Sequence, residues 1–177
     1  MQPSRTIIRE LRRLASPESY LYALADLMPL VPDLTKAALK VLLHRLVRSG
    51  ELERVCRGIY LYPFVDYPSH LLLYHVVSIL RPKHINYLSL ESVLSETGII
   101  SQAPFSWIGI ISTGRSATLS CGKFGTIEFI HTKRALESYA DELAYDKERR
   151  LWIASPALAK ADLQRSRSAS LDLIQEG

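Results

Sequence analysis

The sequence predicts an α+β fold in two parts, a basic N-terminal domain over residues 1–63 and a mixed α/β domain over residues 64–177. Three observations support this division. Apolar residues recur with helical spacing in the first part, whereas short β-forming runs alternate with helical segments in the second. Residues 1–62 hold ten Lys/Arg and six Asp/Glu, and the remainder holds twelve of each, so the net charge of +4 belongs to the first part. A basic module beside a neutral one indicates that only the first part meets a polyanion.

Two helices are predicted ahead of Pro29. The segment Ser4–Leu14 has helical spacing, and its apolar residues are Ile7, Ile8, Leu11 and Leu14. The run Ser16-Pro17-Glu18 has the composition of a helix start, with a capping serine, a proline in the first turn and an acid near the positive end of the dipole. We therefore expect a second helix from Ser16 to about Met28.

A third, basic helix is predicted from Asp33 or Thr35 to Ser49, with Gly50 as its C-terminal stop. One side of its helical wheel is apolar and comprises Ala38, Leu39, Leu42, Leu43 and Leu46. The other side carries cationic side chains, namely Lys36, Lys40, His44 and Arg48, with Arg45 near the edge. The small residues Ala37 and Val41 lie between the cations, so little bulk blocks an approaching ligand.

A β-hairpin is predicted next, with strands over 51–56 and 59–62 joined at Arg57-Gly58. The order of helix, helix, basic helix and hairpin predicts a winged helix-turn-helix. In that fold the basic helix enters the major groove of DNA, and Arg54 and Arg57 of the hairpin lie within reach of the backbone or minor groove. The alternatives are that the cations form an ordinary solvated helix face or that the domain binds a protein.

The C-terminal domain is predicted to alternate helices and strands. The expected helices run from Pro68 to about Leu80, from a Ser89 cap to Thr97, and for about ten residues from Ser155-Pro156; the expected strands are 85–88, 106–112, 117–121, 126–131 and 150–154. The strands 117–121 and 126–131 show two-residue alternation and are expected to form a hairpin. We expect the Ser-rich tail from Arg167 to fray.

No catalytic residue, cofactor, metal site or membrane span is predicted. Cys56 and Cys121 form no CxxC pair, and the five histidines form no HxxxH pattern. The longest apolar stretch, 71–80, is too short to span a bilayer, and arginines interrupt the N-terminus where a signal peptide would lie. These features predict a soluble, cytoplasmic protein that is not an enzyme.

Two groups of residues in the C-terminal domain have further chemical interpretations. The segment formed by Thr113, Gly114, Arg115 and Ser116, together with Ser112, is either a phosphate-binding loop or a solvated turn between strands. Because an exposed arginine beside glycine and hydroxyls can bind an anion or a carboxylate, this turn is a candidate binding surface for such a group. Cys121 and His131 lie across the expected hairpin and could imitate a nucleophile and its base, although no third orienting group is visible.

The motifs in both parts resemble the AbiEi-type antitoxin family. The resemblance covers most of residues 34 to 163 and is carried by the segments 43–52, 57–60, 87–94, 98–102, 113–115 and 124–132, and by Ala154-Ser155-Pro156 with Ala159 and Asp162. The family commonly has Glu-Lys after the Ser-Pro pair, whereas this chain has Ala157-Leu158.

The resemblance implies a winged-helix repressor that autoregulates its operon and serves as the antitoxin of a type IV toxin–antitoxin system. Its implied partners are double-stranded operator DNA with inverted repeats and, functionally, a co-encoded nucleotidyltransferase toxin opposed by the C-terminal domain. With this role, the turn of Thr113, Gly114, Arg115 and Ser116 is our candidate antitoxin surface. The alternatives are an orphan winged-helix regulator, a protein-interaction module without a toxin partner, and an enzyme whose C-terminal domain acts on a nucleotide or RNA.

Overall fold

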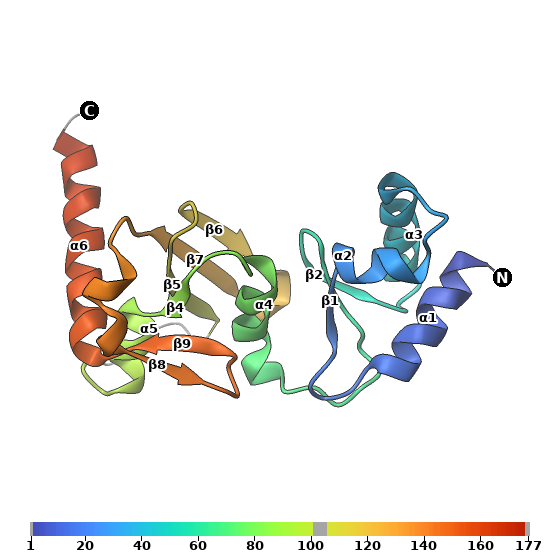
Figure 1. Ribbon diagram of the computed structural model, residues 1–177, viewed down its shortest axis with the longest axis horizontal. Coiled ribbons are helices and arrows are strands. Elements are labelled where there is room, and N and C mark those ends of the chain that lie inside the picture. Colours follow the sequence, from blue (N-terminus) through green and yellow to red (C-terminus); the bar gives the residue numbers. More distant parts are fainter. Residues whose placement is uncertain (1, 101–105, 176–177) are drawn as a thin grey trace. The chain divides into compact units, whose positions relative to one another are not determined.

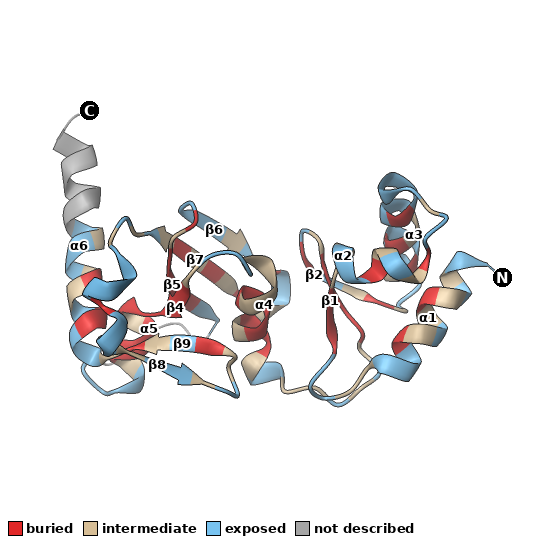
Figure 2. Cartoon of the chain, viewed as in Figure 1, coloured by how far each residue is buried: buried red, intermediate tan, exposed pale blue. Residues whose placement is uncertain are grey.

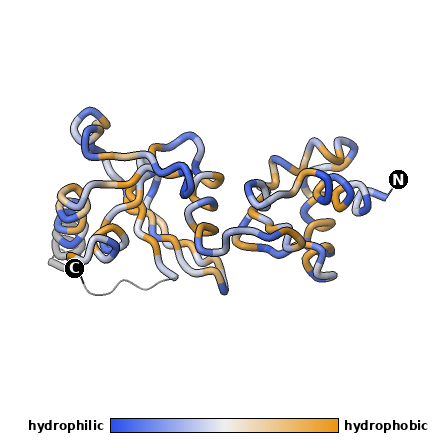
Figure 3. The backbone as a smooth tube through the Cα atoms, turned by 90° about the horizontal axis from the view of Figure 1, so that it is seen from below, coloured by the Kyte–Doolittle hydropathy of each residue, from blue (hydrophilic) through white to orange (hydrophobic). Residues whose placement is uncertain are grey.

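A computed structural model of the protein describes residues 2–100 and 106–175 and shows a mixed α+β chain with two sheets (Figure 1). The chain divides into two compact units, unit 1 over Met1–Leu72 and unit 2 over Leu73–Gly177. Among the described residues, no helix combines the length and apolar character needed to cross a membrane. Figure 3 shows hydrophobic and hydrophilic residues alternating along the chain.

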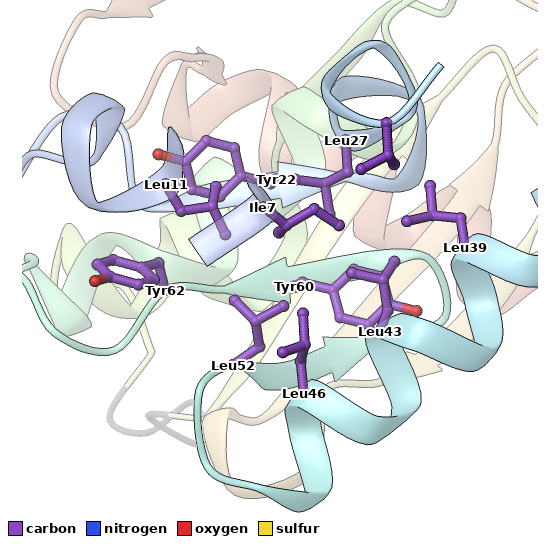
Figure 4. Packing of buried hydrophobic residues seen from close by; sticks show 11 residues of the cluster. Ile7, Leu11, Tyr22, Leu27, Leu39, Leu43, Leu46, Leu52, Tyr60 and Tyr62 are labelled. Atoms are coloured by element: carbon purple, nitrogen blue, oxygen red, sulfur yellow. The ribbon is translucent and has the colours of Figure 1, made fainter. Parts of the chain in front are cut away.

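Unit 1 packs three helices against a small antiparallel sheet. Its elements are α1 (Pro3–Leu14), β1 (Leu21–Ala23), α2 (Leu24–Leu27), the 3-10 turn η1 (Met28–Leu30), α3 (Lys36–Arg48), β2 (Glu53–Cys56), β3 (Ile59–Leu61) and the 3-10 turn η2 (Ser69–Leu71). The sheet order is β1-β3-β2, so β3 lies in the middle. Residues from every one of the longer elements meet in one apolar cluster, which Figure 4 shows with Leu39, Leu43 and Leu46 of α3 beside Tyr60 of β3.

The predicted helix from Ser16 to Met28 is wrong in its first part: residues 16–23 are not helical, and only α2, Leu24–Leu27, forms within the predicted range. Ser16 and Ser19 form a tight turn through two reciprocal backbone hydrogen bonds of 3.0 Å, and Ser16 Oγ accepts from the N–H groups of Glu18 and Ser19. The chain then extends into β1, where Leu21 pairs with Leu61 of β3. The local helix-start signal is overridden because aromatic residues flanking Leu21 are buried by this pairing, and a residue's strand preference depends on such tertiary packing.

The predicted basic helix and hairpin are confirmed as α3, β2 and β3. Thr35 caps α3, its side chain accepting a hydrogen bond from Ala38 N–H, and Gly50 ends the helix with a φ of 78°. Leu39, Leu43 and Leu46 are buried as expected. Ala38, which we placed on the apolar side, is instead exposed.

Unit 2 is built on a mixed six-stranded sheet of order β6-β7-β5-β4-β9-β8. The strands are β4 (Asn86–Leu88), β5 (Trp107–Ser112), β6 (Ala117–Ser120), β7 (Thr126–His131), β8 (Leu143–Asp146) and β9 (Leu151–Ala154). The helices are α4 (Leu72–Leu80), α5 (Leu90–Glu96) and α6 (Pro156–Gln175), and short 3-10 turns occur at η3 (Gly122–Phe124), η4 (Leu136–Ser138) and η5 (Ala140–Glu142). Strand β5 runs parallel to β7 and antiparallel to β4, which runs parallel to β9.

Most predicted elements of unit 2 are confirmed, with three corrections. The edge strand β8 was not expected, and α6 continues to Gln175 rather than ending after about ten residues. Ser89 precedes α5 but makes no side-chain cap, and its hydroxyl donates to Asp162. Two residues of the 98–102 motif, Ser101 and Gln102, lie outside the described residues.

A buried carboxylate ties α6 to the sheet of unit 2. Asp162 is 5% exposed and accepts hydrogen bonds from Tyr87 Oη at 3.0 Å and Ser89 Oγ at 2.8 Å. Arg165 Nη1 donates to its other oxygen at 3.0 Å. Burial, assisted by the neighbouring Asp162 charge, raises the pKa of Tyr87 well above its usual value, so the phenol remains a donor. This arrangement explains why an acid stands among the buried residues of α6.

Replacing Asp162 with alanine should destabilise unit 2 by about 2–4 kcal/mol, because two buried hydroxyls lose their acceptor. Asp162→Asn keeps an acceptor oxygen and should cost less. Both tryptophans of the chain, Trp107 and Trp152, lie in unit 2, so tryptophan fluorescence in a urea titration reports this unit. Equal losses for the two variants would contradict the role given to the carboxylate.

Candidate nucleic-acid interface

The cationic side of α3 faces away from the core of unit 1. Its three buried leucines occupy one side of the helix, and the outward side carries the exposed residues Lys36, Ala37, Lys40, Val41, His44, Arg45 and Arg48. Figure 2 shows the resulting division of α3 into a buried and an exposed side. Val41, between the cations, is 54% exposed. All five predicted binding residues on this helix are therefore exposed.

The hairpin adds two exposed arginines to unit 1. Arg54 lies opposite Tyr60 in β2, just before a register shift, and its Nε donates to Cys56 O at 3.4 Å. Arg57 is exposed at the turn, where Gly58 has a φ of 81°. The carbonyl of Gly58 accepts a hydrogen bond from Leu24 N–H at 3.0 Å. This bond ties the hairpin turn to the start of α2 and fixes its position within the unit.

Sequence reasoning missed a group of arginines on α1. Arg5, Arg9 and Arg12 line an open groove with Arg45 of α3, and the apolar part of its lining comes from Ile8, Leu42 and Leu46. Hydrogen bonds from Arg9 and Arg13 hold the pKa of Glu10 below its usual value. The Glu10 carboxylate therefore neutralises part of the positive charge of the α1 arginines. The spacing of these arginines along one helix face was a signal that could have revealed the groove.

The Thr113–Ser116 segment is a turn between β5 and β6 rather than the start of a helix. Thr113 is half-buried, Gly114 is buried, and Arg115 and Ser116 are exposed. Gly114 N–H donates to Ser112 Oγ at 3.0 Å, and Ser116 Oγ accepts from His131 N–H at 2.9 Å. The turn is thus tied to the ends of β5 and β7, with the Arg115 side chain left accessible.

The geometry does not support a catalytic pair of Cys121 and His131, or a metal site among the described residues. Cys121 is buried and its N–H donates to Gly125 O, whereas His131 lies at the other end of β7, so the two side chains do not form a pair. In the described ranges, no group of three His, Cys, Asp or Glu residues could hold a metal ion.

Replacing Gly58 with valine should destabilise unit 1 by about 1–3 kcal/mol, because a β-branched residue is strained at positive φ. No atom lies within 4 Å of the added Cβ position, so the cost is conformational rather than steric. Gly58→Asn should cost less, since asparagine tolerates this region. The measurement is urea unfolding by far-UV circular dichroism, and similar losses for valine and asparagine would show that the turn lacks this strain.

The comparisons with known proteins bear on the same part of the chain. No curated protein matches it. Residues 31–63, which contain α3, β2 and β3, match the family model described as transcriptional regulator, AbiEi antitoxin. The resemblance indicated by the sequence motifs is thereby confirmed: over residues 31–63 this chain is similar to the AbiEi antitoxin family of transcriptional regulators.

Proposed function

We propose that unit 1 is a winged helix-turn-helix that binds double-stranded operator DNA and represses the operon of its own gene. The observation that carries this proposal is the exposed cationic side of α3, which stands next to an arginine-bearing hairpin in one unit. In this assignment α2 and α3 form the helix-turn-helix, α3 is the recognition helix, and β2 and β3 form the wing. Lys36, Lys40, His44, Arg45, Arg48, Arg54 and Arg57 are the proposed DNA-binding residues.

The chemistry of this surface suits a DNA duplex. Lysine and arginine side chains contact phosphates and guanine edges, and their charge dominates affinity. Ala37 and Val41 are exposed between the cations, where small apolar groups permit close approach and can contact a thymine methyl group. The exposed valine also fits a protein partner, which is the competing function. Salt dependence and operator selectivity distinguish the two.

We further propose that the chain is the antitoxin of a type IV toxin–antitoxin system, acting in the cytoplasm without catalysis. The family matched by residues 31–63 includes antitoxins, which supports this role. In this proposal, the C-terminal domain, which we begin at residue 64, opposes a co-encoded nucleotidyltransferase toxin through a surface distinct from α3. The competing proposal is an orphan regulator, which would lack a toxin gene beside its own.

The first prediction from this function concerns salt. If four to six cations of one protomer contact phosphates, log K should fall with log salt at a slope of about −4 to −5 per protomer. Lys40→Ala and Arg48→Ala should each reduce the slope by roughly one. The measurement is fluorescence anisotropy with a duplex from the region upstream of the gene. Binding that does not change between low and physiological salt would exclude the DNA interface.

The second prediction concerns separation of the two roles. The triple variant Lys36→Ala, Lys40→Ala, Arg48→Ala should lose repression while remaining folded, because all three side chains are exposed. Expressed from an independent promoter, it should still protect cells from the toxin encoded beside the gene. Loss of protection in a folded, abundant triple variant would show that one surface serves both roles.

A further inference from the structure

The neutral net charge of the C-terminal region conceals a concentration of cations at one end of the unit 2 sheet. Asn86 of β4 pairs with Ser112 of β5, and Ser112 pairs with His131 of β7. Because β4 is antiparallel to β5 and β7 is parallel to it, the segments before β4, after β5 and after β7 meet at the same end. These segments cover residues 81–85, 113–116 and 132–134, far apart in the sequence.

The three segments carry many cations and no acid. We name this surface the basic sheet end and define it by six residues, Arg81, Lys83, His84, Arg115, His131 and Lys133. Five of them are exposed, and Arg81 is half-buried. Residues 81–86, 112–117 and 131–134 contain no aspartate or glutamate. Arg134 is not included, because it lies 4.0 Å from the buried Asp162.

Contacts between the segments hold this surface together. The Arg81 guanidinium lies 3.7 Å from the centre of the Phe129 ring, and its Nη1 donates to Ser112 Oγ at 3.2 Å. Thr113 Oγ1 lies 3.4 Å from His84 Nδ1, and Gly114 O lies 2.8 Å from His131 Nδ1. Gly114 lies between Arg81 and His84. A Cβ atom at this position would lie 2.8 Å from Arg81 Nη1 and 3.3 Å from His84 Cδ2. The glycine allows the cationic segments to approach one another closely.

The outer cations are unpaired among the side chains that the structure describes. Within residues 2–100 and 106–167, no ion pair or hydrogen bond involves the side chain of Lys83, Arg115 or Lys133. Clustered like charges repel one another, and the acids Asp146 and Glu148 at this end of the sheet lie at the turn between β8 and β9, on the far side of β4 from β5. An anionic ligand would therefore gain from all three at once.

We propose that the basic sheet end is a second DNA-binding surface, which contacts the phosphodiester backbone of the duplex held by unit 1. This inference rests on the proposed function of unit 1. Backbone contacts use cations and hydroxyls, and both are present around the Thr113–Ser116 turn. The surface is open and spread over three loops, which suits an extended polyanion. A weak site of this kind is effective because the tether to unit 1 gives it a high local concentration of the same DNA.

The test uses the full chain with charge-reversal variants on each surface. The patch variant is Arg115→Glu with Lys133→Glu. The matched control is Lys123→Glu with Lys160→Glu, which removes the same charge from exposed positions of unit 2; Lys123 precedes β7 and Lys160 lies on α6, after the far end of β9. Affinity is measured between 50 mM and 200 mM salt with a 60-bp duplex from the region upstream of the gene, and with an RNA hairpin. Circular dichroism and tryptophan fluorescence confirm that each variant is folded.

The patch variant should reduce the salt slope on DNA by about two. The loss of affinity between the two salt concentrations should then be roughly tenfold smaller than for the unaltered chain. Control and patch variants that behave alike would overturn the proposal, and so would an effect confined to the RNA hairpin. A variant with Lys40→Ala and Arg48→Ala distinguishes failure of the unit 1 interface from failure of the basic sheet end. If that variant binds DNA normally while the patch variant does not, the proposed function of unit 1 fails and the basic sheet end stands.

Discussion

The packing of α3 into the core of unit 1 is the constraint on which the proposed interface depends. Leu39, Leu43 and Leu46 are buried against β3 and α1, and this contact sets the rotation of α3 about its own axis. Burying these side chains stabilises the unit by about 1.5–3 kcal/mol each, far more than any single exposed cation contributes. The cations are therefore held outward by leucines that never touch the ligand. A change in the apolar side would disturb recognition as much as a change in the cations.

In unit 2, as in unit 1, the residues that hold the structure together are different from the exposed charged residues. There the pairing of β4, β5 and β7 brings together cations that lie up to 50 residues apart in sequence. Gly114 lets the segments approach, while Arg81 is fixed by Phe129 and Ser112. In the same unit, Asp162 anchors α6 to β4 through Tyr87. In both units, buried contacts position the charged groups and leave them accessible.

The sequence predicted the elements that depend on local interactions and missed those that depend on residues far apart in the chain. The helix α3 and the hairpin rest on local signals, namely the leucine spacing, the Thr35 cap and the glycines at positive φ, and these were visible in the sequence. Strand β1 was missed because its identity depends on pairing with β3, forty residues later. The basic sheet end was missed for the same reason, since the register of three strands, not any local motif, assembles it. Asp162 gave no sign of its burial, because its partners Tyr87 and Ser89 lie more than 70 residues earlier.

The central claim is that the exposed side of α3 lies in the groove of a DNA duplex, and site-specific photocrosslinking tests it most directly. The photoreactive residue p-benzoylphenylalanine replaces Val41 in one variant and Phe64 in another; both residues are highly exposed in unit 1. Each protein is irradiated with a labelled duplex from the region upstream of the gene. The account predicts a strong crosslink to DNA from position 41 that excess unlabelled duplex abolishes, and little from position 64. Equal crosslinking from both positions, or crosslinking to protein alone from position 41, would contradict it.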